Sequence, residues 1–194
     1  MLQSIWLIPF LPLLGSALLG FLGLLKLGTR GEKLDKKLVS FIALASVGLS
    51  FLLSCGIVCQ AFLLDHRENF RMELFTWLRA GTLPLTQGGL GTFEVPWGFQ
   101  LDPLSGIMIL VVTGVGFLIH IYSTGYMWAD TGYYRFFSYL NLFMFAMLTL
   151  VLADNFLLLY IGWELVGLCS YLLIGFWFER PAAAAAGKKA FLVT

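Results

Sequence analysis

The sequence predicts an all-α integral membrane protein with about five transmembrane helices, the start of a sixth, and a β-hairpin outside the bilayer between helices two and three. The chain of 194 residues is 59% hydrophobic and only 12% charged, and its mean hydropathy is +0.88. A soluble domain is about half apolar and about a quarter charged. The apolar residues also form several runs of about 20 residues, the length that a helix needs to cross a bilayer.

The first two predicted spans cover about residues 5–25 and 38–64. The first is expected to be a retained span, because no basic segment precedes it and no small-residue cleavage site follows it. The second is long enough to be tilted or to extend into the interface. Both carry small residues at spacings that allow close helix packing: Ser16, Gly20, Gly23, Ser46, Ser50 and Ser54.

Residues 65–101 form the one long polar interval. Its pieces 72–77 and 92–100 are β-prone, and they are separated by a Leu-Pro pair and a Gly-Gly pair. This pattern is typical of a β-hairpin, which we expect to lie outside the bilayer. The register across 81–94 is left open. The whole chain, residues 1–194, is therefore predicted to form one transmembrane domain with this hairpin inserted.

Helix-start signals divide the second half into further spans. Asp102 is a favoured N-cap and Pro103 suits the first helical position, so a third span begins here and runs to about residue 122. The fourth covers about 136–152. A short turn at Asp154 and Asn155 leads into the fifth, about 156–178, and an alanine-rich segment after Pro181 begins a sixth helix.

The basic residues predict the orientation. If the first span runs inward, nine of the 12 Lys and Arg residues fall on the inner side, and the outer interval holds three: Arg67, Arg71 and Arg79. Cytoplasmic loops carry an excess of Lys and Arg, so the N-terminus and the hairpin of this multi-pass protein are expected outside. The net charge of +1 gives no reason to expect nucleic-acid binding.

Glu164 is the main candidate for chemistry, because it lies near the middle of the fifth span. An ionised, unpaired carboxylate at that depth costs several kcal/mol, so the side chain must be neutral, paired or hydrated. Its structural interpretation is a protonated glutamate that hydrogen-bonds a neighbouring helix. Its functional interpretation, which we favour, is a proton-relay carboxylate, because ionisable groups within spans are mostly functional.

Other polar residues have simpler interpretations. His120 titrates near neutral pH and could lie on a proton path, but a single histidine near a helix end more often packs or sits at the interface. Asp102 and Asp154 are explained as helix caps. Lys188 and Lys189 could snorkel beside the sixth helix, or one of them could face the bundle, so Lys189 is kept as a second possible path residue.

The sequence gives no sign of a metal or a cofactor. Cys55, Cys59 and Cys169 lie in apolar runs, where they read as small buried hydrophobic residues. Cys55 and Cys59 share a helix face but have no further Cys or His nearby, so we predict no metal site. There is also no phosphate-binding glycine loop, iron–sulfur cluster motif or haem ligand pair. We therefore expect no cofactor and no redox chemistry in this chain.

The stretch around Glu164 resembles one family. LADN at 152–155 and GWELVGLCSYLLIGF at 162–176 are similar to the antiporter-like subunit of NADH:quinone oxidoreductase (respiratory complex I), called subunit L in bacteria and chain 5 in organelles. Further similar segments are LDPLS at 101–105, VTGVGFLIHIY at 112–122, RFFSYLNLF at 135–143 and KAFLVT at 189–194. The first hundred residues resemble the family mainly in layout.

The resemblance implies a proton-translocating subunit whose partners are the lipid bilayer and the other membrane subunits of complex I. It implies a helix bundle with an outer N-terminus and hairpin. It also implies that Glu164 matches the family's proton-path glutamate, which pairs with a lysine on a later, broken helix. Family members are several times longer, so we expect this chain to be their N-terminal part and to be inactive alone.

Two alternatives stay open. The same segments are similar to the corresponding component of multisubunit Na+/H+ antiporters, in which case the protein is a transporter rather than part of a redox enzyme. The chain could also be a non-pumping structural membrane module. Neighbouring reading frames for quinone-site or iron–sulfur subunits would favour complex I, and further antiporter subunits would favour the transporter.

Overall fold

The computed structural model describes residues 2–30, 34–64, 69–85 and 89–193. After a short 3-10 turn at Leu2–Ser4, the elements are α1 (Leu7–Arg30), α2 (Lys36–Val58), β1 (Phe70–Leu85), β2 (Gly89–Leu101), α3 (Pro103–Tyr126), α4 (Tyr133–Leu152), α5 (Phe156–Ile174) and α6 (Pro181–Val193). In this part of the chain, five helices are long and apolar enough to cross a membrane. The predicted membrane class, with a hairpin between the second and third helices, is confirmed.

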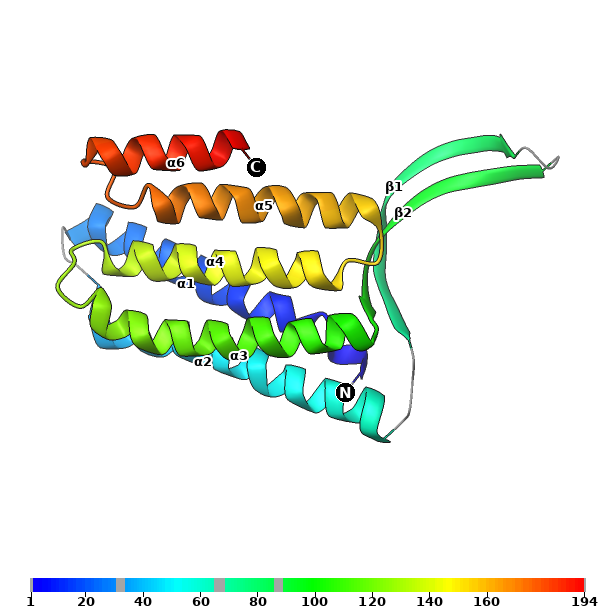
Figure 1. Cartoon of the computed structure of the whole chain (residues 1–194), viewed down its shortest axis with the longest axis horizontal. Helices are drawn as coiled ribbons and strands as arrows, with labels where there is room; N and C mark the ends of the chain where they lie inside the picture. The colour runs from blue at the N-terminus through cyan, green and yellow to red at the C-terminus, as the bar shows by residue number, and fades with distance from the viewer. Residues whose placement is uncertain (1, 31–33, 65–68, 86–88, 194) are drawn as a thin grey trace.

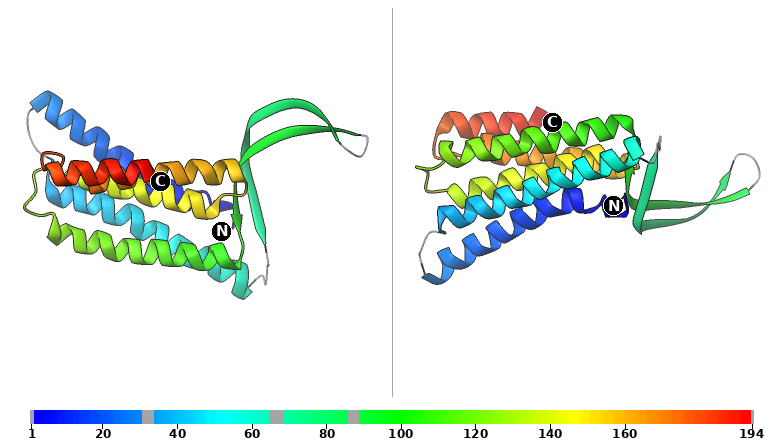
Figure 2. Two further views of the ribbon diagram at one scale, coloured as in Figure 1. Left: turned by 45° about the horizontal axis from the view of Figure 1, so that its top comes forward. Right: turned by 90° about the horizontal axis from the view of Figure 1, so that it is seen from below.

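The helices lie side by side along one axis, and the hairpin projects from one end of the bundle (Figures 1 and 2). In Figure 1, α4 lies between α3 and α5, and α6 lies on the far side of α5. The turns from α3 to α4 and from α5 to α6 are both at the end opposite the hairpin. The bundle therefore has a hairpin end and a loop end.

Local signals set the helix boundaries. The Asp102 carboxylate accepts a hydrogen bond from the Ser105 N–H (2.6 Å), and the Ser105 hydroxyl accepts one from the Asp102 N–H (2.8 Å). This capping box, with Pro103 in the first turn, starts α3 as expected. The Ser105 N–H also lowers the pKa of the Asp102 carboxyl below its ordinary value. At the end of α2, the chain continues as a π-helix through Cys59–Leu64, so the second helix reaches the predicted residue 64.

Buried polar side chains join the first, second and fourth helices. Three of the small residues singled out in the sequence hydrogen-bond across helices, which replaces the partners that water would supply. The bonds are Ser46 Oγ to Asn141 Oδ1 (2.7 Å), Ser50 Oγ to the Ile8 carbonyl (2.7 Å) and Ser16 Oγ to the Ser138 carbonyl (2.8 Å).

The close approach of α5 to α4 depends on Gly162. A Cβ atom added there would lie 2.8 Å from both the Cα and the N of Leu150, which are backbone atoms that cannot turn aside. A second close approach joins α5 to α6, where a Cβ on Gly187 would lie 3.2 Å from the Cα of Gly175. These glycines let the helices pack backbone to backbone, which fixes how α5 is turned.

The hairpin pairs antiparallel from Phe70 with Leu101 to Leu85 with Gly89, and its register shifts at three places. It is longer than the predicted pieces. Its base is docked on the bundle, because Phe99 and Leu101 are buried and the Asn155 amide donates to the Pro96 carbonyl (2.9 Å). The tip residues 86–88, part of the interval whose register was left open, lie outside the described residues.

The fifth span is shorter than predicted. It was expected to continue to residue 178, but α5 ends at Ile174, and the N–H of Gly175 bonds back to the Tyr171 carbonyl (2.9 Å). The aromatic residues at 176–178 resemble the apolar residues of the span in the sequence, which is why the span was predicted to continue. Phe176 instead turns into the core beside α4, where it is 4% exposed.

Candidate functional site: the Glu164 face of α5

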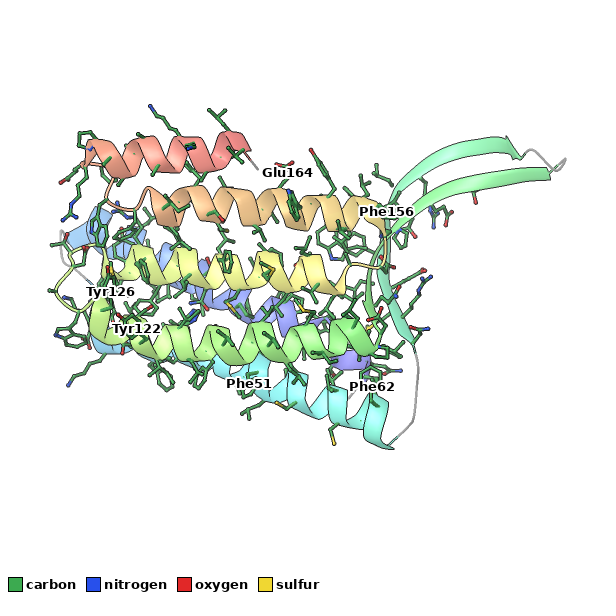
Figure 3. The ribbon with its side chains drawn as sticks, viewed as in Figure 1. Phe51, Phe62, Tyr122, Tyr126, Phe156 and Glu164 are labelled. Carbon is green, nitrogen blue, oxygen red and sulfur yellow. The ribbon has the colours of Figure 1, made fainter. Side chains whose placement is uncertain are left out.

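Glu164 is the ninth of the 19 residues of α5, so it lies about 12 Å along the helix from its start. Its side chain is exposed, on the side of α5 that points away from α4 (Figure 3). The hydroxyl of Tyr160, one turn earlier on the same helix, lies close enough to the Glu164 carboxylate to interact with it electrostatically. Among the described residues, no ion pair to Glu164 is found. The expected mid-span position is confirmed, whereas its role stays a prediction.

The start of α5 holds this face in place. The Asn155 side chain accepts a hydrogen bond from the Leu158 N–H (2.9 Å) and therefore caps the helix. The same side chain donates to the hairpin, so the cap also ties α5 to β2. Along α5, Leu158, Gly162, Gly167 and Cys169 are buried, and Gly162 faces the backbone of Leu150 on α4. Glu164 is consequently held on the outward stripe.

The outward stripe of α5 is apolar and aromatic around the carboxylate. Tyr160 is 58% exposed, Trp163 51% and Leu168 38%. In Figure 3, α6 runs beside the second half of α5. Within the described residues, the acid therefore lies in an apolar surface, with a tyrosine hydroxyl as its polar neighbour.

His120 is fully buried between α3 and α4. Its Nδ1 donates to the Gly116 carbonyl (2.7 Å), its ring lies 6.2 Å from that of Phe137, and its Nε2 has no partner in the described part of the chain. It lines a groove of ≈ 220 Å³ with apolar residues that include Met144. The packing interpretation of His120 fits this environment.

Lys188 and Lys189 are both exposed on α6. Lys188 lines a groove of ≈ 480 Å³ between α5 and α6, together with Leu168 and Tyr171. Of the two lysines, it is thus Lys188 that lies along α5, although the sequence suggested Lys189 as the path residue.

The three predicted path residues do not converge. His120 faces α4 from the α3 side, whereas Glu164 points away from α4 on the other side (Figure 3). No hydrogen bond joins either of them to Lys189 in the portion that the structure describes. These residues form no preassembled relay, and Glu164 is the one placed at an open surface within a span.

Tyr160 is the site residue that sequence reasoning missed. It lies four positions before Glu164, and residues spaced i, i+4 are neighbours on a helix surface, so the spacing alone could have indicated the pair. Cys169 is buried, as expected, whereas Cys55 is half-buried and Cys59 is exposed, so the prediction of buried cysteines is wrong for Cys59. No cluster of three or more metal-ligating side chains occurs among the described residues, and the absence of a metal remains a prediction.

Comparisons with known proteins support the resemblance. Residues 89–137 match the family described as "NADH-Ubiquinone oxidoreductase (complex I), chain 5 N-terminus", and residues 153–194 match "NADH:quinone oxidoreductase/Mrp antiporter, TM". The second family groups oxidoreductase and antiporter proteins, so it does not separate those two alternatives. It includes the Glu164 region.

Curated relatives are named as oxidoreductase subunits. NADH-quinone oxidoreductase subunit L of Mycobacterium tuberculosis is 45% identical over 97% of this chain and 27% of its own length. Subunit L of Escherichia coli is 44% identical over 95% of this chain and 27% of its own length. The chloroplast NAD(P)H-quinone oxidoreductase subunit 5 of Mesostigma viride is 43% identical over 98% of this chain and 27% of its own length.

The chain spans about a quarter of the length of these relatives, 27% in each case. Their names favour the complex I interpretation over the antiporter alternative. The similarity covers nearly all of the chain, including the hairpin and the first two helices, which resembled the family in layout. The chain is a multi-pass membrane protein that belongs to the subunit L and chain 5 family of NADH:quinone oxidoreductases.

Proposed function

We propose that this chain forms part of a proton-translocating membrane subunit of an NADH:quinone oxidoreductase, and that Glu164 takes up and releases a transported proton. The observation that carries the proposal is a carboxyl group halfway along a span, on an open face. Within the described residues, the polar neighbour of Glu164 is Tyr160, on the same helix. Electron transfer would take place in other subunits.

The Tyr160 hydroxyl and a cation from elsewhere would share control of the Glu164 proton. A hydroxyl can donate to the ionised carboxylate, which offsets part of its desolvation. A lysine on a further helix, as the family resemblance implies, would favour the charged form when close and the protonated form when it withdraws. Proton affinity would then follow the movement of the lysine.

The test is proton uptake together with NADH:quinone turnover in membranes that contain the assembled complex. Glu164→Gln keeps the size of the side chain but removes its titratable proton, so we expect normal assembly, lowered pumping and lowered turnover. Glu164→Asp should be milder, because it retains the carboxyl. Glu73→Gln is the matched control, since Glu73 is exposed on β1, outside the spans. Wild-type pumping by an assembled Glu164→Gln protein would overturn the proposal.

We further propose that the hairpin end of the bundle faces outward in a bacterial plasma membrane, from the distribution of Lys and Arg. Single cysteines at Gly81 on β1 and Thr131 at the loop end, in a protein without its three native cysteines, should react with a membrane-impermeant reagent from opposite sides. Both positions are exposed. Labelling of Thr131→Cys and not of Gly81→Cys in intact cells would reverse the orientation.

A further inference from the structure

A polar cleft of ≈ 550 Å³ opens at the loop end of the bundle. Its walls come from the turn before α4, the first turn of α4 and the turn between α5 and α6, with Gly23 of α1 on one side. Its charged side chains are Asp130, Arg135, Glu179 and Arg180. The adjoining helices α4 and α5 are spans, so the cleft lies where a membrane has its lipid headgroups.

Arg135 is held in this cleft with hydrogen-bonding capacity to spare. Its guanidinium lies over the rings of Phe176 (4.8 Å) and Phe178 (5.2 Å), which fixes its plane. One terminal nitrogen donates to the Phe176 carbonyl at 3.4 Å, a long bond, and the enclosed Nε has no partner among the described residues. Because the Nε is enclosed, a phosphate group would bind the terminal nitrogens of this planar guanidinium.

Arg180 adds a second cation, lying 5.1 Å from the Trp177 ring that it covers. Trp177 in turn donates through its indole N–H to Asp130 (2.9 Å), and Asp130 also accepts from the Gly132 N–H (2.7 Å). The carboxylate of Asp130 is therefore committed to ordering the turn. Glu179, which is exposed, is the acid left at the rim of the cleft.

The start of α4 adds positive charge to the cleft. Neither α4 nor α6 has an acidic residue in its first turn, and Gly132 gives α4 no side-chain cap. The N-terminal N–H groups of a helix carry a partial positive charge. For α4, whose first-turn residues Tyr134 and Arg135 line the cleft, this partial charge adds to the charge of the two arginines.

We propose that this cleft binds the headgroup of a zwitterionic phospholipid, with its phosphodiester at Arg135 and Arg180 and its ammonium group at Glu179. The lining has two positive and two negative side chains, and Glu179 at the rim offers a partner for an ammonium group, which phosphatidylglycerol lacks. Trp177 and Phe178 supply the amphipathic and apolar contacts found at headgroup level. The proposal does not depend on proton transport.

The test uses the delipidated chain in detergent, with phosphatidylethanolamine or phosphatidylglycerol added, and bound lipid counted by native mass spectrometry. We expect phosphatidylethanolamine to bind more tightly, and Arg135→Gln to weaken it about tenfold, the effect of losing a charge-assisted hydrogen bond. Lys37→Gln is the matched control, because exposed Lys37 lies at the start of α2, at the same end, but does not line the cleft.

Two further measurements test which headgroup the cleft prefers, and whether it binds a lipid rather than free phosphate. Glu179→Gln should shift the preference toward phosphatidylglycerol, because it removes the partner of the ammonium group. If Arg135→Gln does not fold, Arg180→Gln takes its place in the same assay. Equal binding by wild type and the arginine variant, a wild-type preference for phosphatidylglycerol, or displacement of the lipid by millimolar inorganic phosphate would each overturn the proposal.

Discussion

The two faces of α5 have opposite surroundings, although Gly162 and Glu164 are only two positions apart. Gly162 is buried, and a side chain there would meet the backbone of α4. Glu164 lies on the exposed stripe. Within the described residues, its polar neighbour is Tyr160, which is on the same helix. One face of the helix therefore holds the bundle together, and the other carries the one acid within a predicted span. Substitutions on the two faces should separate stability from proton transfer.

The largest effect is expected from Gly162→Val. Its Cβ would lie 2.8 Å from the Leu150 Cα, so α4 and α5 would have to move apart, at a cost of about 3 kcal/mol or more. The thermal unfolding temperature in detergent should fall sharply. Gly125→Val is the matched control, since nothing lies within 4 Å of a Cβ there. Equal losses in both variants would mean that valine weakens the helices generally and that close packing at Gly162 has no special role.

A smaller effect is expected from the buried hydrogen bond between Ser46 and Asn141 (2.7 Å). A double-mutant cycle with Ser46→Ala and Asn141→Leu should give a coupling energy of about 1 kcal/mol, the scale of such bonds in membranes. The measurement is the free energy of unfolding of the four proteins. Purely additive effects would show that this bond contributes nothing to the packing of α2 against α4.

The smallest effect is expected at Asp130, at the loop end. Burial alone would raise its pKa, but the hydrogen bonds from Trp177 and Gly132 and the charges of Arg135 and Lys36 outweigh that effect, so the pKa of Asp130 lies below 3.8. When the pKa of a carboxyl group is lower in the folded state, the group stabilises the protein at pH values above its ordinary, unfolded-state pKa. This stabilisation is lost as the pH falls through the folded-state pKa.

Asp130→Asn should therefore unfold at a slightly lower temperature than wild type at about pH 6, and the difference should shrink below about pH 3.8. The comparison with wild type cancels the titration of the other carboxyl groups. A difference that does not change with pH would show that the charge of Asp130 is not what stabilises the turn.

Much of the fold could be predicted from the sequence, because the signals are local. Apolar runs set the spans, and Asp102 with Pro103 marked a helix start that the structure confirms. The end of α5 could not be predicted in this way. Phe176 looks like the apolar residues before it, and only its packing into the core and under Arg135 explains why the chain leaves the helix.

The candidate site was only partly predictable. Mid-span depth singled out Glu164, but its direction depends on which stripe of α5 is buried, and that stripe is set by the contact of Gly162 with α4. An i, i+4 spacing could have suggested Tyr160. The cleft at Arg135 brings together the turn before α4 and the turn after α5, which are about 45 residues apart in sequence. A local sequence pattern cannot predict such a contact.

Infrared difference spectroscopy of the assembled complex in membranes tests most directly whether Glu164 exchanges a proton. Spectra taken with and without NADH-driven turnover should contain a carboxyl stretching band that is present in the wild type and absent in Glu164→Gln. The band should persist, shifted, in Glu164→Asp, which keeps a carboxyl group. Identical difference spectra for the wild type and an assembled Glu164→Gln protein would contradict a proton-carrying role and leave Glu164 as a fixed, hydrogen-bonded side chain.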